Sequence, residues 1–168
     1  MVKWVLEDDC LAPRARIEIT YKGKNPLKVL SGLTERLIAN FETSSANIYE
    51  RDYRWDTSSD PRRFFIRIYA RRKWDLRNTM MVEIIFEGLQ PSDPSKDGEI
   101  TIKIGGIMKT EFELDTAFKK LPIYKALLWL YCRLFYADVR RGYLKFCQTR
   151  IDKFADELRK TLEIPESK

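Results

Sequence analysis

Three long strand-like segments follow one another in the middle of the chain with only short connections between them. They cover residues 47–55, 62–74 and 78–89, separated by the polar loop 56–61 and a tight turn near Asp75. A crossover between parallel strands needs a dozen or more residues, so these segments are predicted to form an antiparallel meander. A fourth strand, 99–104, follows the polar loop 90–98. Gly105 and Gly106 predict a bulge before it continues over 107–114.

A strand and a helix are predicted before this meander, and a second helix is predicted after it. Residues 14–22 alternate apolar and polar side chains, which predicts a half-buried strand. Asn25 and Pro26 then form a helix-start signal, and the helix is expected to end near Glu42. From Pro122 a second helical pattern runs to about Glu163, with a bend expected at Gly142.

We therefore predict one α+β domain over residues 1–168. Its antiparallel sheet has five or six strands in the order β-α-β-β-β-β-α and packs on a long C-terminal helix. Residues 1–13 form an N-terminal segment, 14–114 the strand, helix and sheet, and 121–163 the long helix.

The element order over residues 14–163 resembles the helix-grip fold of START-like and Bet v 1-like proteins. That fold has two short helices after its first strand, whereas this chain has room for one. The resemblance implies a curved sheet wrapped around the C-terminal helix, with ligands held between them. It rests on element order, so no functional residue of the family is carried over.

Several chemistries are excluded by what the sequence lacks. It contains no histidine, which removes Ser-His-Asp and Cys-His catalysis and imidazole metal sites. No glycine-rich phosphate loop occurs, and no sheltered carboxylate pair is evident. We therefore expect no catalytic residue, no metal and no cofactor, and we favour a binding protein over an enzyme.

The cysteines and the apolar segments indicate where in the cell the protein is expected. Cys10, Cys132 and Cys147 form no CxxC pair, and we expect all three to be reduced thiols. Asp8 and Asp9 interrupt any secretory signal. The most apolar stretch, 121–137, is too short to span a bilayer and contains two cations, so no transmembrane segment is expected. A cytoplasmic protein is the simplest expectation.

The 62–73 segment suggests one functional hypothesis. One face of this strand is apolar, and the other combines aromatic rings with cations: Arg63, Phe65, Arg67, Tyr69, Arg71 and Lys73. Such faces bind RNA by stacking bases on rings and pairing phosphates with arginines. Pairing with the next strand would set Glu83 opposite Tyr69 and Glu87 opposite Phe65. Hairpin pairing would set Glu50 beside Arg67. A neutralised charge ladder is thus the alternative interpretation, and a protein-interaction surface is the third.

The 47–55 strand suggests a second hypothesis, which we place first. If Tyr49 and Tyr53 face the core, alternation places Arg51 there too, and a buried guanidinium needs an anion or an opening to water. We therefore expect Arg51, Tyr49, Tyr53 and Trp129 to line a site between the sheet and residues 122–137. The site would bind an apolar or amphipathic small molecule through its acidic head.

The C-terminal segment also has more apolar surface than one sheet can cover. Its residues 115–168 carry 12 basic and 7 acidic groups of the overall +6 charge. Trp129, Tyr136 and Tyr143 alternate there with Arg133 and Arg140. This surface fits a bound ligand, a homodimer contact or a membrane interface. Nucleic acid is a less favoured partner.

Overall fold

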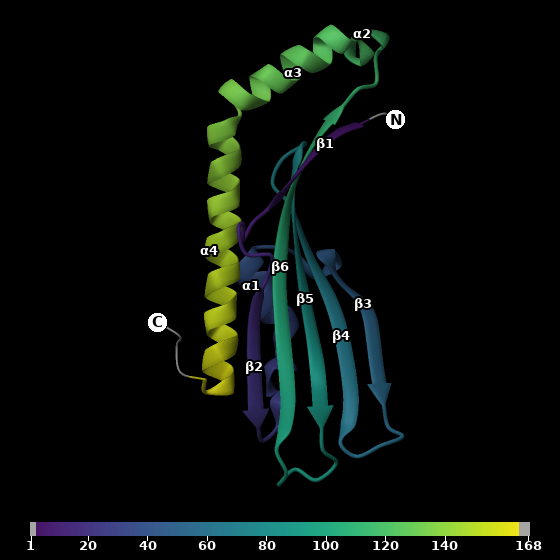
Figure 1. Cartoon of the computed structure of the whole chain (residues 1–168), viewed down its shortest axis with the longest axis vertical. Helices are drawn as coiled ribbons and strands as arrows, with labels where there is room; N and C mark the ends of the chain where they lie inside the picture. The colour runs from purple at the N-terminus through teal and green to yellow at the C-terminus, as the bar shows by residue number, and fades with distance from the viewer. Residues whose placement is uncertain (1–2, 165–168) are drawn as a thin grey trace.

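The computed structural model describes residues 3–164 and contains one antiparallel sheet of six strands with helices on one of its faces (Figure 1). The strands are β1 (Lys3–Asp9), β2 (Ile17–Gly23), β3 (Ile48–Asp56), β4 (Arg62–Lys73), β5 (Asn78–Gln90) and β6 (Gly98–Glu113). The helices are α1 (Leu33–Phe41), α2 (Ala117–Lys120), α3 (Pro122–Leu134) and α4 (Ala137–Leu162), with short 3-10 turns η1 (Pro26–Leu30) and η2 (Ser45–Asn47). The predicted α+β class, antiparallel sheet and long C-terminal helix are confirmed.

The strand order is β1-β6-β5-β4-β3, and β2 shares an edge of β6 with β1. Strand β2 pairs with residues 98–104 of β6, and β1 pairs with residues 107–113. The two partners therefore lie end to end, and Gly105 and Gly106 fall between them. The bulge predicted at these glycines is wrong, because β6 pairs with β5 without interruption through both.

Helices α1 and α4 cover the inner face of the sheet, which we define as the face they contact. Its side chains join those of both helices in one buried cluster, in which Phe64, Ile84 and Phe86 of the sheet meet Ile151 and Phe154 of α4. At Gly106 the helix comes especially close, because a Cβ added there would lie 2.5 Å from the Ile151 side chain. Within residues 3–164, the opposite face, which we call the outer face, carries no helix (Figure 1).

The C-terminal helical segment is broken at Phe135–Tyr136, not at Gly142 as predicted. Helix α3 ends at Leu134 and α4 begins at Ala137 in a different direction (Figure 1). Tyr136 is buried at this break, where it packs on Phe112 and accepts a hydrogen bond from the Asn78 side chain. These contacts hold Tyr136 against the sheet. Gly142 lies in the exposed interior of α4, with nothing near its added Cβ.

A disulfide joins Cys10, just after β1, to Cys147 in α4. The expectation of three reduced thiols is therefore wrong for two of them, because the N-terminal strand brings Cys10 beside the helix. Cys132 is a buried free thiol, and burial raises its pKa. Over the described residues, no helix is both long enough and apolar enough to cross a bilayer.

Candidate binding groove on the outer face of the sheet

The outer face carries the charged ladder that the strand alternation predicts. Tyr69 lies opposite Glu83 and Phe65 opposite Glu87, as expected from the sequence. The Tyr69 hydroxyl donates to Glu83 at 2.6 Å, and this hydrogen bond raises the pKa of Tyr69. Arg16 pairs with the other oxygen of Glu83, also at 2.6 Å. Glu83 is thus fully engaged by neighbouring groups.

Arg51 occupies an irregularity in the pairing of β3 with β4. The register shifts between Glu50 and Asp52, so that Asp52 lies opposite Arg67 and Glu50 opposite Ile68. The predicted pairing of Glu50 with Arg67 is therefore wrong. Because Arg51 is the extra residue, the two-residue alternation breaks there. Its guanidinium lies over the Tyr69 ring, 5.7 Å from the centroid, on the outer face.

The four residues expected to line one ligand site are not brought together. Tyr49 lies opposite Tyr69, and with Arg51 it belongs to the outer face. Tyr53 lies past the shift, opposite Ile66, and stacks on Trp55 at 6.5 Å. Trp129 lies on α3, with the Arg133 guanidinium 5.2 Å from its ring centroid. Of these four residues, only Tyr49 and Arg51 line the same hollow.

The six residues of the nucleic-acid hypothesis do share the outer face, because all lie at alternate positions of β4. The Phe65 ring is flanked by guanidiniums, with Arg54 at 5.6 Å and Arg67 at 5.4 Å from its centroid. Arg67 also lies 3.8 Å from Glu83. The rings of this face are therefore already contacted by protein cations.

Two adjoining hollows form a groove across the upper part of the outer face, which we call the outer groove. They have volumes of about 750 and 360 Å³ and share Tyr69, Met81 and Ile107. Met81 and Ile107 lie opposite each other on β5 and β6 and form an apolar floor, with both side chains more than a third exposed. Gly105 lies beside this floor and contributes no side chain to it.

Charge is distributed unevenly around the outer groove. Lys109 lies 3.5 Å from Glu7 and 3.6 Å from Glu111, so the cation on the β1 side is neutralised. On the opposite side, the Arg51 and Arg71 guanidiniums make no ion pair within residues 3–164. Glu50 is the one acidic group that lines the groove on that side. The β3–β4 side therefore presents two arginines against one carboxylate.

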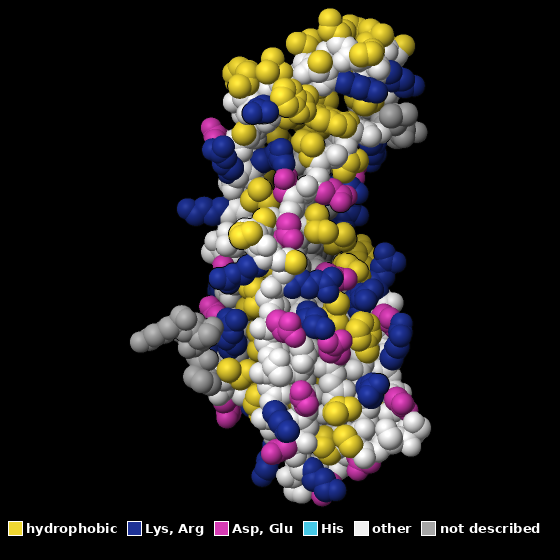
Figure 2. Space-filling view, viewed as in Figure 1, with side chains coloured by type: hydrophobic (Ala, Val, Ile, Leu, Met, Phe, Trp, Pro, Cys, Tyr) yellow, Lys and Arg dark blue, Asp and Glu magenta, His cyan; other side chains and the backbone are white. Residues whose placement is uncertain are grey.

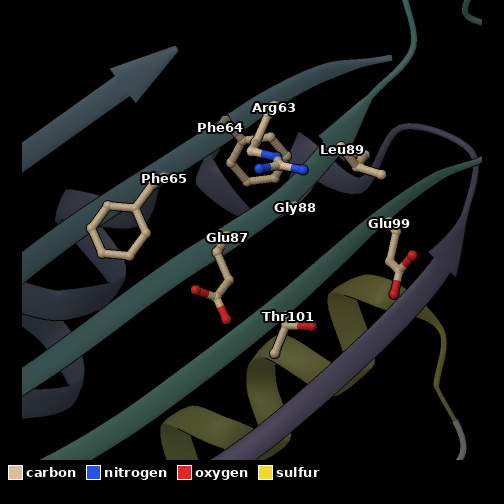
Figure 3. A pocket seen from close by; sticks show the side chains of 8 residues that line it. All are labelled: Arg63, Phe64, Phe65, Glu87, Gly88, Leu89, Glu99 and Thr101. Atoms are coloured by element: carbon tan, nitrogen blue, oxygen red, sulfur yellow. The ribbon is translucent and has the colours of Figure 1, made fainter. Parts of the chain in front are cut away.

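A separate hollow of about 410 Å³ lies at the lower end of the outer face. Phe65, Glu87 and Thr101 project into it from three neighbouring strands (Figure 3). Glu87 forms an ion pair with Lys103, so the charge there is compensated. Two acids, Glu87 and Glu99, line this hollow, and guanidiniums already flank its Phe65 ring, so it offers less for an anionic ligand than the outer groove.

The residues of the outer groove were only partly found from sequence. Tyr49, Arg51, Tyr69 and Arg71 were all singled out, but in two separate hypotheses. Met81 and Ile107 were missed, although both are apolar residues at outward positions of their strands. Among the described residues, no group of acidic or cysteine side chains is arranged to hold a metal ion.

Comparison with known proteins does not identify a family. No family model matches the chain, and no curated protein matches it. A solved structure of a protein of unknown function from Staphylococcus aureus is similar at 11% identity, covering 88% of this chain and 94% of the other, with a TM-score of 0.27. A putative uncharacterised protein from Rhizobium leguminosarum shows 6% identity, covering 91% and 99%, with a TM-score of 0.23.

Proposed function

We propose that this protein binds a small amphipathic anion in the outer groove and performs no chemistry on it. The observation that carries the proposal is the placement of Arg51 and Arg71 beside the exposed floor of Met81 and Ile107. An apolar body would cover the floor, and a carboxylate or phosphate would accept hydrogen bonds from the arginines. Tyr49 and Tyr69 would flank the ligand, since aromatic walls with few polar groups are typical of ligand sites.

The ligand class is the one inferred from sequence, but its location differs. Sequence reasoning placed the ligand between the sheet and residues 122–137, with Arg51 facing inward. The inner face is filled where α4 covers it, because Ile102, Ile104 and Phe154 are fully buried in one cluster. Because the register shifts at Arg51, Tyr49 and Arg51 lie on the outer face while Tyr53 lies opposite Ile66, and we place the acid-binding role on the outer face with Arg51.

The proposal is tested by titrating the protein with dodecanoate and measuring the affinity by calorimetry. Arg71→Ala removes one guanidinium from the groove and should weaken binding at least about tenfold, since a charge-assisted hydrogen bond contributes about 1.5–3 kcal/mol. Arg63→Ala is the matched control, because Arg63 lies on the same strand and face but lines the lower hollow instead. It should leave the affinity unchanged.

A second variant tests the floor of the groove. Met81→Glu places a carboxylate where the apolar body of the ligand would lie and should abolish binding. Because Met81 is exposed, the variant should fold normally, which circular dichroism checks. Equal affinity of the wild type, Arg71→Ala and Met81→Glu proteins would reject the outer groove as the binding site.

Nucleic-acid binding is the second candidate, favoured by the run of Arg63, Arg71 and Lys73 along one strand. These three cations are exposed and make no ion pair within the described part of the chain. Binding to single-stranded RNA should then weaken steeply with salt, and Arg67→Ala should lower the affinity. The guanidiniums that flank Phe65 favour the small anion, because they occupy the ring faces that bases would use.

Two broader expectations remain proposals. Kinship with the helix-grip fold is supported by β2 lying beside the last strand and by α4 packing across the inner face. A cytoplasmic location is compatible with the Cys10–Cys147 disulfide in hyperthermophiles, whose intracellular proteins are rich in disulfides. The 33% content of charged residues agrees with such a source.

A further inference from the structure

Helices α2 and α3 form an arm, residues 117–134, that extends beyond the end of α4 (Figure 1). One side of α3 is anchored to the body of the protein. Its Leu128 and Cys132 pack with Phe112, Trp4 and Leu6 at the end of the sheet. The arm is thus held at its base, while most of its other large apolar side chains are exposed.

The other side of the arm is apolar and exposed. Along α3 the exposed side chains recur at the three- and four-residue spacing of one helix face, at Ile123, Leu127, Leu130 and Leu134. Ile123 is 66% exposed and Leu134 61%. The exposed surface continues at both ends of α3 through Phe118, Leu121 and Phe135, and hydrophobic side chains crowd this end of the molecule (Figure 2). An apolar patch of this extent marks an interaction surface.

The charge of the arm has one sign. Residues 116–137 contain four cations and no acid. The cations are Lys119, Lys120, Lys125 and Arg133, and the nearest acids are Asp115 and Asp138 at the two ends. Lys125, Trp129 and Arg133 recur every four residues in a second row of α3, on a different side of the helix from the exposed apolar row. A helix with an apolar face and cations on its polar face is the pattern of helices that lie in a membrane interface.

We propose that this arm binds the surface of an anionic lipid membrane, with α3 lying in the plane of the interface. The apolar row would enter the boundary between headgroups and acyl chains, and the cations would contact lipid phosphates and carboxylates. Helix α3 has 13 residues, too few to span a bilayer. Charge decides against a second copy of the chain, because a two-fold contact would bring the same four cations together.

The test is flotation of the full chain with vesicles of phosphatidylcholine alone or with about 30% phosphatidylserine, a strongly anionic surface. We expect binding to the anionic vesicles and at least about tenfold weaker binding to the neutral ones. The double variant Ile123→Glu/Leu134→Glu should lower binding at least about 100-fold, because it removes two apolar side chains that would be buried in the membrane. Leu76→Glu is its matched control, since Leu76 is a 91% exposed leucine in the β4–β5 turn.

The charge requirement is tested separately. Lys125→Gln should weaken binding about fivefold, whereas Lys145→Gln, an exposed lysine on α4, should not. Three results would overturn the proposal: no binding to anionic vesicles, equal binding to both vesicle types, or a stable dimer in solution that the Ile123→Glu/Leu134→Glu variant dissociates. The last result would assign the arm to a second copy of the chain.

Discussion

Cys10, just after β1, is bonded to Cys147 in α4, 137 positions further along the chain. The bond lies over Gly106, whose added Cβ would be 3.3 Å from the Cys147 sulfur and 3.4 Å from the Cys10 Cβ. One glycine of β6 therefore makes room for both the disulfide and the helix. The N-terminal strand, the last strand and the C-terminal helix meet at this point.

Removing the disulfide should destabilise the protein substantially. A cross-link that closes so long a loop lowers the entropy of the unfolded chain, by up to about 5 kcal/mol in the chain-entropy account. We expect the Cys10→Ala/Cys147→Ala variant to unfold at least about 10 °C below the wild type. Reductant should lower the wild-type midpoint and leave the variant unchanged. Three reactive thiols in the denatured, unreduced chain would contradict the disulfide.

The close approach at Gly106 predicts a contrast between two adjacent glycines. Gly106→Ala would push a methyl group against Ile151 and should cost about 1–3 kcal/mol of unfolding free energy. In Gly105→Ala the added methyl group points to the outer face, where the nearest side-chain atom, in Arg16, is 3.4 Å away. It should cost much less. Urea denaturation of the two variants measures this, and equal costs would show that α4 does not approach β6 as described.

The buried side chain of Asn78 joins the break between α3 and α4 to the sheet. The Asn78 side chain donates to Tyr136 and to Asp75, and accepts from Thr110 at 2.8 Å. Tyr136→Phe removes the hydroxyl that accepts from Asn78 and should cost about 1–2 kcal/mol. Tyr131→Phe is the control, because Tyr131 is an exposed tyrosine nearby. If the thermal unfolding midpoint shifted equally in Tyr136→Phe and Tyr131→Phe, the Tyr136 hydroxyl would have no such role.

The hydrogen bonds around Asn78 also predict that Asp75 contributes to the stability of the protein in acid. Burial raises the pKa of Asp75, but hydrogen bonds from the Asn78 side chain, two backbone N–H groups and Tyr143 outweigh it, and the pKa is lowered. Since the folded-state pKa lies below that of the unfolded chain, the stabilisation is present above about pH 4 and is lost as the pH falls through the folded-state value.

In Asp75→Asn, the urea midpoint should therefore fall less steeply below about pH 4 than it does in the wild type. Asp152→Asn serves as the control, because Asp152 is exposed on α4. The pH dependence of urea unfolding, followed by tryptophan fluorescence, provides the comparison. If the urea midpoint of Asp75→Asn fell with pH as steeply as that of the wild type, the folded state would not lower the pKa of Asp75.

The strands were predictable because their alternation is regular. The two faces of β4 and its pairing with β5 follow from a period of two residues, and both are confirmed at Tyr69 and Glu83. The orientation of Arg51 was not predictable, since a bulge adds a residue without any glycine or proline to mark it. Strand β1 was missed because Asp8 and Asp9 interrupt its apolar pattern.

The helix break and the disulfide depended on tertiary contacts. Gly142 was the local signal for a bend, but an exposed glycine inside a helix lowers stability without forcing a kink. The break occurs instead where Tyr136 is drawn onto Phe112 and Asn78. Likewise, the pairing of Cys10 with Cys147 required the position of β1 along β6, which no local pattern in the sequence specifies.

The central claim is that the outer face of the sheet holds the ligand, while the inner face is filled by the core. Backbone amide shifts of the ¹⁵N-labelled protein on titration with dodecanoate test it most directly. We predict that the perturbed amides cluster around Arg51, Arg71, Met81 and Ile107 and that those of Phe154 and Leu158 in α4 stay unchanged. Perturbations concentrated in α4 and the inner-face core, with none around Arg71, would contradict it.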